Sequence, residues 1–390
     1  MSSPEDARRS LHVLTITPFF PSDQNEVNGC FVAEPIEEFK KLKIRSSVIA
    51  VSPVYRPQKR ASTVAPAEWF RYPQIPGTLG LSSAGNWLYI RLLRRIQHLH
   101  RKNPIDVIHA HSALPAGHAA ALLSRRLKIP FVVTVHGLDV FNAFSQSGIS
   151  STWRRKISLD VYRAARNVIC ISGKVQEILR AGSPFEIRST IVYNGVDPTL
   201  FSPDPANLCS AAQILTVGNL IRSKGQDLVL RAIAKLQNLF PNLRCHIVGE
   251  GTDRFHLEAL TQQLGIASLV QFTSRESRSA VADAMRRCSV FVLPSSNEAL
   301  GCVYLEAMSC GRPVIACEGQ GVDEVIVHQK NGWLIPVDGL EDLEEGLKAL
   351  FDSAELRARI GDAARQTILD RLTLAHQAQH LATIYREATE

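Results

Sequence analysis

Short runs of β-branched and other apolar residues alternate along the chain with longer segments in which apolar residues return every three or four positions. The short runs are typical of strands buried on both faces of a parallel sheet, and the longer segments are typical of helices packed against it. This alternation predicts an α/β protein. We expect strands at residues 11–17, 47–51, 106–111, 131–136, 167–172, 190–197 (ending in a turn), 214–218, 244–248, 269–273, 290–293, 313–316 and 331–336.

The length and the position of the prolines predict two domains. A chain of 390 residues is long for one core, because single cores rarely grow beyond about 250–300 residues. We place a Rossmann-like domain at 1–197, a proline-rich linker at 198–207 and a second Rossmann-like domain at 208–372. Residues 52–85 are rich in proline and glycine with little periodicity, which indicates an irregular insertion.

The charge is distributed unevenly between the two halves. Residues 1–200 carry 26 Lys+Arg and 14 Asp+Glu, although the whole chain has a net charge of only +7. A basic first half favours an anionic partner, and a membrane face or a lipid-linked acceptor fits better than nucleic acid, for which no motif is present. The basic segment 86–102, which contains Trp87 and Tyr89, can lie on an anionic membrane or can be an ordinary outer helix of the domain.

The cysteines and the apolar runs favour a cytoplasmic protein. The eight cysteines are scattered and form no C-x-x-C pair, so we expect free thiols rather than disulfides or a metal site. Acidic residues precede the first apolar run, and His12, Thr15 and Pro18 interrupt it, so the amino-terminal segment does not resemble a signal peptide. No window of eighteen uninterrupted apolar residues occurs, so no membrane-spanning helix is expected.

The segment 294–319, PSSNEALGCVYLEAMSCGRPVIACEG, predicts a strand, a loop, a helix and a further strand. Pro294 ends the strand at 290–293, and Gly301 permits a tight turn before a helix at 303–309. Gly311 stands where a glycine ends a helix. Units of this kind place ligands at the carboxyl end of the strand, against the amino terminus of the helix.

Two glutamates, Glu298 and Glu306, flank this loop with seven residues between them. The first carboxylate can accept hydrogen bonds from a polyhydroxylated ligand, and the second can hold a vicinal diol such as a ribose. Amides of the first helical turn, at 301–303, point toward an anion. The arrangement suits a nucleotide-sugar, although two solvated glutamates on an ordinary strand–helix unit would give the same spacing.

The stretch NEALGCVYLEAMSCGRPVIA resembles the E-x7-E signature of the family 4 retaining glycosyltransferases (GT4), which have a GT-B fold. The resemblance extends over nearly the whole chain. It implies two Rossmann-like domains that face a cleft, with the donor on the second domain, the acceptor on the first, and a final helix at about 373–388 that crosses back to the first. The pattern P…N…G-x-F-V resembles bacterial enzymes of cell-surface polysaccharide synthesis, of the teichuronic acid type.

The resemblance also implies roles for individual residues. It implies catalytic roles for His136, which ends an H-G-x-D strand, for Glu298 and for Lys224. It implies donor contacts for Gly29, Arg222, Gly249, Gly251, Gly301, Cys302, Val303 and Glu306. It implies acceptor-side roles for His109, His111 and Asp139. The family usually has arginine where this chain has Asn219, and Arg222 is the candidate to supply the missing cation.

The expected reaction is transfer of a hexosyl unit, with retention, from a nucleoside diphosphate sugar to a glycan or lipid-linked acceptor. A UDP-sugar is the first expectation for the donor and GDP-mannose the second. No D-x-D occurs in the chain, so we expect neither a metal nor another cofactor, and Lys224 with helix amides would stabilise the leaving diphosphate.

Other functions remain open at this point. A catalytically silent GT-B subunit that binds a sugar nucleotide or a partner would be expected to lose Lys224, Glu298 or Glu306, and all three are present. A nicotinamide dehydrogenase needs a G-x-G-x-x-G fingerprint after the first strand, which is missing. A GT-B epimerase is a further alternative. A metal site at His109 and His111 lacks a third ligand at a recognisable spacing.

Overall fold

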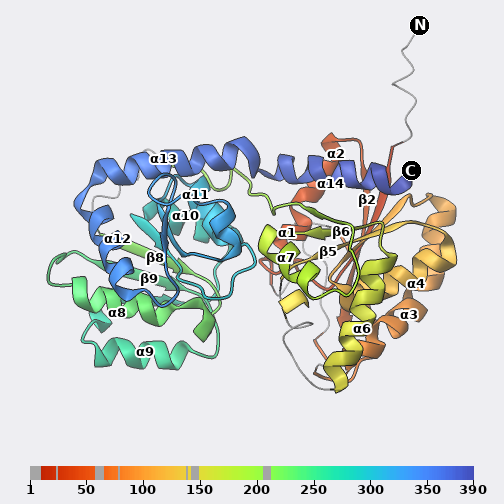
Figure 1. Ribbon diagram of the computed structural model, residues 1–390, viewed down its shortest axis with the longest axis horizontal. Helices are drawn as coiled ribbons and strands as arrows, with labels where there is room; N and C mark the ends of the chain where they lie inside the picture. Colours follow the sequence, from red (N-terminus) through yellow and green to blue (C-terminus); the bar gives the residue numbers. More distant parts are fainter. Residues whose placement is uncertain are drawn as a thin grey trace, which may run out of the picture. The chain divides into compact units, whose positions relative to one another are not determined.

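The computed structural model describes residues 10–22, 25–57, 66–77, 80–137, 139–141, 149–204 and 212–390 (Figure 1). The chain forms two compact units, residues 1–193 with 374–390 (unit 1) and residues 194–373 (unit 2). Each unit is a Rossmann-like layer of parallel strands with helices around it, which confirms the predicted α/β class. No helix in the described ranges is both long and apolar enough to span a lipid bilayer.

Unit 1 contains a seven-stranded parallel sheet in the order β3-β2-β1-β4-β5-β6-β7. The strands are β1 (His12–Thr17), β2 (Arg45–Pro53), β3 (Glu68–Tyr72), β4 (Val107–His111), β5 (Phe131–Val135), β6 (Asn167–Cys170) and β7 (Ser189–Ile191). Every residue of the four central strands β1, β4, β5 and β6 is buried, as expected for a parallel sheet covered on both faces.

The helices of unit 1 cover this sheet and include the carboxyl-terminal helix. They are α1 (Cys30–Ala33), α2 (Pro35–Lys41), α3 (Leu81–Lys102), η3 (Ala113–Gly117), α4 (His118–Leu127), α6 (Ile149–Ala164), α7 (Gly173–Ala181) and α14 (Leu374–Thr389). In Figure 1 the blue helix α14 runs beside α2, and its residues Leu381 and Tyr385 join the same core as Phe39. The predicted return of the last helix to the first domain is therefore confirmed.

The segment 52–85 is less irregular than the sequence suggested. Its residues Glu68–Tyr72 form β3, which pairs in parallel with β2 at the edge of the sheet. Four of its five side chains are half-buried, so the strand lacks the continuous apolar pattern of the central strands. An ion pair between Glu68 and Arg95 ties β3 to α3, which begins at Leu81, before the expected Asn86.

Unit 2 contains a six-stranded parallel sheet in the order β10-β9-β8-β11-β12-β13. The strands are β8 (Gln213–Val217), β9 (Arg244–Val248), β10 (Val270–Thr273), β11 (Val290–Val292), β12 (Val314–Cys317) and β13 (Trp333–Ile335). The helices are η4 (Arg222–Lys224), α8 (Gln226–Leu236), α9 (Arg254–Gln263), η5 (Ala267–Leu269), α10 (Arg278–Arg287), α11 (Cys302–Ser309), η6 (Gly321–Glu324), α12 (Leu340–Asp352) and α13 (Ala354–Arg371).

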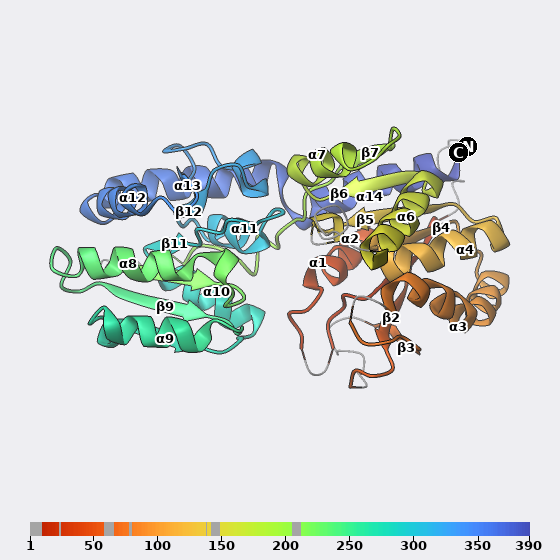
Figure 2. The same ribbon diagram turned by 60° about the horizontal axis from the view of Figure 1, so that its bottom comes forward.

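Helices lie on both faces of the unit 2 sheet. Buried apolar residues of α8, α9 and α12 form a core with one face, and Figure 2 shows α8 and α9 side by side along it. On β11, Val290 and Val292 belong to this core, and Phe291 between them points to the opposite face. There its ring lies 5.7 Å from that of Tyr304 on α11. The loop between β11 and α11 therefore lies at the carboxyl edge of the sheet, as the sequence predicted.

The chain crosses between the units close to the expected boundaries. The sequence divided the domains at 197 and 373 with a linker at 198–207, and the contacts divide them after Tyr193 and after Thr373. The described part of the linker is held on unit 2, where Phe201 is fully buried, and just before it the amide of Val196 donates to the carbonyl of Leu372 at 2.9 Å. Residues 205–207 of the linker lie outside the described residues. The assignment of acceptor and donor to the two domains stays a prediction.

Candidate functional site

Glycine residues bring the loops at the carboxyl edge of the unit 2 sheet into close contact. A Cβ atom on Gly249, after β9, would lie 1.9 Å from the carbonyl oxygen of Gly218, after β8. A Cβ atom on Gly251 would lie 2.1 Å from the carbonyl oxygen of Leu220. These positions therefore accept only glycine, and the two predicted donor contacts lie against the loop that leads to Lys224.

Lys224 and Glu298 form an ion pair at this edge. The Nζ atom of Lys224 lies 2.5 Å from Oε2 of Glu298, and the two side chains are only 17% and 11% exposed. The backbone of Glu298 is fixed separately, because its amide donates to Gln320 at 3.0 Å and its carbonyl accepts from Gly321 at 3.0 Å. Two residues predicted to be catalytic are thus brought together from positions 74 residues apart.

Gly301 starts α11 next to this ion pair. Its φ of 78° is a left-handed conformation, and a Cβ atom there would lie 2.4 Å from the ring of Tyr304 and 3.1 Å from Cγ of Glu298. A glycine has no side chain with which to cap the first amides of the helix. Since Cys302 and Val303 are only half-buried, the positive end of the α11 dipole is accessible to an anion beside Lys224.

Glu306 lies in the second turn of α11 with its side chain 4% exposed. It forms an ion pair with Arg278, the first residue of α10, which the sequence analysis did not single out. No spacing signal connects the two, because Arg278 stands 28 residues earlier on another helix. Only the packing of α10 beside α11 brings the guanidinium to the carboxylate.

Arg222 lies in η4, two residues before Lys224, and its side chain is exposed. Within the described ranges Arg222 forms no ion pair, so its charge is available to a ligand. Asn219 is also exposed, and its backbone carbonyl oxygen accepts a hydrogen bond from Nε2 of Gln226 at 3.1 Å. The structure therefore keeps one cation close to the position where the related enzymes usually have arginine.

In unit 1, Gly29 and His136 lie at a common site. Gly29 has a φ of 79°, and a Cβ atom there would lie 2.3 Å from the carbonyl carbon of Phe19. This close approach brings Phe31 to His136, with 4.8 Å between the ring centroids, and Phe19 contacts the same imidazole at 5.6 Å. The two phenylalanines were not identified from the sequence, where Phe19 and Phe31 resemble ordinary core residues.

His136 is held by His111 and by Asp139. Its Nε2 lies 3.0 Å from Nδ1 of His111, and the two rings are stacked at 5.2 Å. Its backbone amide donates to Oδ1 of Asp139 at 3.0 Å. Burial lowers the pKa of His136 to about 3, and burial together with the neighbouring His109 and His136 lowers the pKa of His111 well below its ordinary value. Both rings are therefore neutral at neutral pH, and one donates to the other.

His109 is a buried link between the sheet and α14. Its Nδ1 lies 2.7 Å from the hydroxyl of Tyr385, its Nε2 lies 2.7 Å from that of Thr134, and the residue is 2% exposed. Both nitrogens are thus engaged inside unit 1, which favours a structural role over an acceptor contact. Asp139 likewise accepts from the amides of His136 and Val140, and burial raises its pKa to about 6. The acceptor-side roles of both residues stay predictions.

In the part of the chain that the structure describes, neither a metal centre nor the pocket of unit 2 coincides with these groups. Among the described residues no group of three or more His, Cys, Asp or Glu side chains is arranged to hold a metal ion. A pocket of about 710 Å³ opens on unit 2 beside Gln213, Arg244 and Val270. These residues begin β8, β9 and β10, so the pocket lies at the opposite edge of the sheet from Lys224 and Glu298.

Comparison with family models and curated proteins gives consistent matches. A family described as glycosyl transferases group 1 matches residues 209–367, and glycosyltransferase family 4 matches residues 31–200. An uncharacterized glycosyltransferase of Methanocaldococcus jannaschii is 30% identical over 263 residues, covering 67% of this chain and 70% of that protein. The putative teichuronic acid biosynthesis glycosyltransferase TuaC of Bacillus subtilis is 25% identical, and the match covers 97% of this chain and 99% of that protein.

Solved structures show the same fold. Anabaena HepE in complex with UDP and glucose superposes with a TM-score of 0.75 and 20% identity, covering 96% of this chain and 98% of that chain. At this level of identity the similarity establishes the architecture only.

The clash at Gly301 leads to a stability prediction. Gly301→Ala should destabilise unit 2 by about 1–3 kcal/mol more than Gly265→Ala, because both positions have positive φ but only Gly301 faces a buried ring. Around Gly265 a Cβ atom would meet nothing within 4 Å. The Gly265→Ala variant therefore measures only the free energy of placing a non-glycine residue at positive φ. Urea unfolding of the two variants measures the difference. Equal destabilisation would show that the loop before α11 is not tightly packed.

The buried imidazole of His109 predicts a dependence of stability on pH. Its pKa is lowered to about 3 by burial, so below pH 6.5 the unfolded chain binds a proton that the folded chain does not. Stability should be fully present above pH 6.5 and should fall by about 2 kcal/mol between pH 6.5 and pH 5 through this residue. Urea unfolding at several pH values should therefore give a shallower slope for His109→Gln than for the exposed control His98→Gln. Identical slopes would contradict the neutral, buried state of His109.

Proposed function

The chain belongs to the group 1 and family 4 glycosyltransferases with a GT-B fold, and from this premise we propose that it transfers a hexosyl unit from a nucleoside diphosphate sugar to a glycan or lipid-linked acceptor. The matches to both halves of the chain confirm the resemblance seen in the sequence. The observation that carries the proposal is the Lys224–Glu298 ion pair beside the amino terminus of α11, with Glu306 one turn further along the same helix.

The donor is proposed to bind along this edge of unit 2. Its diphosphate lies at the amides of α11 and at Lys224, its ribose hydroxyls donate to Glu306, and its transferred sugar donates to Glu298. The leaving diphosphate gains negative charge as the glycosidic bond breaks, and fixed amides with an ammonium stabilise that charge where it develops. Arg222 adds a second cation in the same loop. A UDP-sugar is the first candidate, because HepE of the same fold was solved with UDP and glucose, and GDP-mannose is the second.

Lys224 changes partner in this proposal. Its ammonium and the Glu298 carboxylate satisfy each other in a site where an unpaired charge is costly. A diphosphate beside α11 competes for Lys224, and the Glu298 carboxylate then accepts hydrogen bonds from the sugar hydroxyls. The ion pair would thus hold both groups in position until the donor separates them.

His136 is proposed to donate a hydrogen bond to the transferred sugar. In the described part of the chain, Nε2 of His136 is engaged by His111, and no partner of Nδ1 is present. A neutral imidazole between Phe19 and Phe31 offers this nitrogen without a charge that would have to be desolvated. His111 and Asp139 then act by holding His136.

We further propose that the anomeric configuration is retained and that no metal is needed. Lys224, Arg222 and the α11 amides would supply the positive charge that a metal ion bound to D-x-D supplies in other enzymes of this chemistry, and the sequence lacks that motif. In a front-face mechanism the acceptor hydroxyl attacks on the side of the leaving diphosphate, whose oxygen takes the acceptor's proton. The new bond then has the orientation of the bond that breaks.

The acceptor is proposed to be a glycan or a lipid-linked glycan of cell-surface polysaccharide or glycolipid synthesis. This assignment rests on the coverage of TuaC, which extends over 97% of the chain. A catalytically silent GT-B subunit is the second candidate, and Asn219, in place of the arginine usual in the family, is the observation that favours it.

Release of free nucleoside diphosphate from a panel of nucleotide-sugars in EDTA tests the donor site. One donor should be turned over, and Lys224→Ala and Glu306→Ala should each lower the rate by about 100- to 1,000-fold, because each removes a group placed on the transition state or on the nucleotide. Glu258→Ala is the control, since Glu258 forms a half-buried ion pair with Arg254 on α9, apart from Lys224, Glu298 and Glu306. Silence with every donor, together with no thermal shift, would contradict the proposal and favour the silent subunit.

The exposed face of α3 leads to a membrane prediction. Trp87 and Ile90 are 48% and 60% exposed, and Arg91 and Arg94 follow on the same face one turn on. We propose that this face rests on an anionic membrane. Vesicles with phosphatidylglycerol should sediment the protein more strongly than phosphatidylcholine vesicles, and Arg91→Glu with Arg94→Glu should abolish the difference. Equal sedimentation with both vesicles would refute a role for this face.

A further inference from the structure

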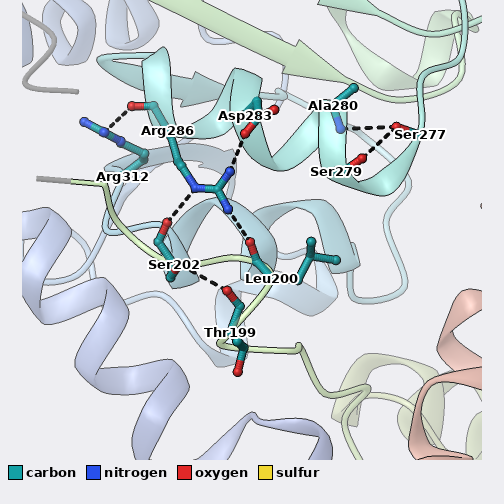
Figure 3. A network of polar contacts seen from close by, with 9 residues as sticks. All are labelled: Thr199, Leu200, Ser202, Ser277, Ser279, Ala280, Asp283, Arg286 and Arg312. Carbon is teal, nitrogen blue, oxygen red and sulfur yellow. Dashed lines mark hydrogen bonds and ion pairs between the residues drawn. The ribbon is translucent and has the colours of Figure 1, made fainter. Parts of the chain in front are cut away.

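The carboxylate of Glu306 is held by an arginine from a neighbouring helix. Arg278 donates from Nη1 to Oε1 of Glu306, and the two side chains are 18% and 4% exposed. Arg278 is the first residue of α10, and the preceding Ser277 caps this helix by accepting from the amide of Ala280 at 3.2 Å (Figure 3). The backbone that carries the guanidinium is therefore fixed.

Phe201 supports the same guanidinium. The Cζ atom of Arg278 lies 4.8 Å from the centroid of the Phe201 ring, a distance at which a cation is attracted to the aromatic face. Phe201 is fully buried, and its carbonyl oxygen accepts from the hydroxyl of Ser309 at 2.6 Å and from Arg365 at 3.4 Å. Since Ser309 is the last residue of α11, the ring is anchored to the helix that carries Glu306.

Arg286 secures the two residues on either side of Phe201. It donates from Nη2 to the carbonyl of Leu200 at 2.6 Å and from Nε to that of Ser202 at 3.1 Å (Figure 3). Asp283 accepts from its Nη1 at 2.5 Å, and Arg312 donates to its carbonyl oxygen. The segment 200–202 therefore stays against α10, and the Phe201 ring stays under Arg278.

This support limits the positions that the Glu306 carboxylate can occupy. A buried carboxylate is costly without a cation, so the ion pair compensates the charge of Glu306 and holds its side chain in one orientation. The contact with Arg278 uses Oε1, and in the described part of the chain Oε2 accepts from no other residue. An ionised oxygen in a fixed place is a strong acceptor for a hydroxyl group.

We propose that Arg278 is a positioning residue that orients Glu306 toward the ribose hydroxyls and so sets the preference for ribonucleotides over 2′-deoxyribonucleotides. This inference rests on the proposed function, in which Glu306 receives the ribose. It differs from a direct role, in which Arg278 itself contacts the base or the phosphates. A direct contact would contribute equally to the binding of ribo- and deoxyribonucleotides.

Calorimetric titration with UDP, 2′-deoxy-UDP, GDP and 2′-deoxy-GDP tests the proposal. The wild-type protein should bind the ribo form of one pair about 10- to 100-fold more tightly, the value of one hydrogen bond to a charged group. Arg278→Met should reduce this ratio to within about threefold of unity while leaving the affinity for the deoxy form within about twofold. Arg254→Met is the control, because it removes a half-buried ion pair of the same unit that does not involve Glu306 and should preserve the ratio.

A second set of variants distinguishes positioning from a structural effect. Glu306→Gln should reduce the ratio as Arg278→Met does, and the double variant should show no further reduction, because both changes remove the same contact. Arg278→Lys keeps the charge without the planar fork and should retain part of the ratio. If Arg278→Met does not fold, Arg278→Lys and Glu306→Gln provide the same readout.

Three results would overturn the inference. Equal loss of affinity for ribo and deoxy forms in Arg278→Met would assign Arg278 a direct contact. An unchanged ratio would show that Glu306 needs no positioning, and additive losses in the double variant would show independent roles. Failure of the proposed function has a different result, in which the wild-type protein binds neither pair or Glu306→Gln leaves the ratio of the bound pair unchanged.

Discussion

The site of unit 2 depends on two carboxylates that have little access to water and are each paired with a cation. An isolated carboxylate in such a place would take up a proton or destabilise the fold, so each has its own cation, Lys224 for Glu298 and Arg278 for Glu306. Close contacts at two glycines serve this requirement, since Gly249 lies against the backbone of Gly218 and Gly225 lies against the carbonyl oxygen of Pro294. They hold the loops after β8, β9 and β11 close enough for a lysine and a glutamate 74 residues apart to meet.

Much of the fold and part of this site could be predicted from the sequence. The central strands carry continuous apolar runs because both faces are covered, whereas β3 was missed because an edge strand shows no such run. The spacing of Glu298 and Glu306 is visible because both belong to one loop and helix. Arg278 and Phe201 were not found, because their contacts depend on how α10 and the segment 200–202 pack, and no local pattern records that packing.

The histidines of unit 1 also show what the sequence could not predict, because two residues with the same position in the pattern have different hydrogen-bond partners. Strand periodicity places His109 and His111 on one face of β4, and equal roles for them are then the natural expectation. Their rings lie 4.3 Å apart, but their hydrogen-bond partners differ, because His109 pairs with Tyr385, 276 residues later on α14, while His111 pairs with His136. His109 thereby connects the last helix to the sheet, whereas His111 holds His136, whose ring contacts those of Phe19 and Phe31.

Hydrogen–deuterium exchange with and without UDP or GDP is the most direct test of the claim that unit 2 binds a nucleoside diphosphate at the carboxyl edge of its sheet. The account predicts slower exchange at residues 222–226 and 298–309 in the presence of the nucleotide that binds, and no change at residues 213–215 and 244–246. Protection confined to the pocket at the opposite edge, beside Gln213 and Arg244, would contradict the account and would separate nucleotide binding from Lys224, Glu298 and Glu306.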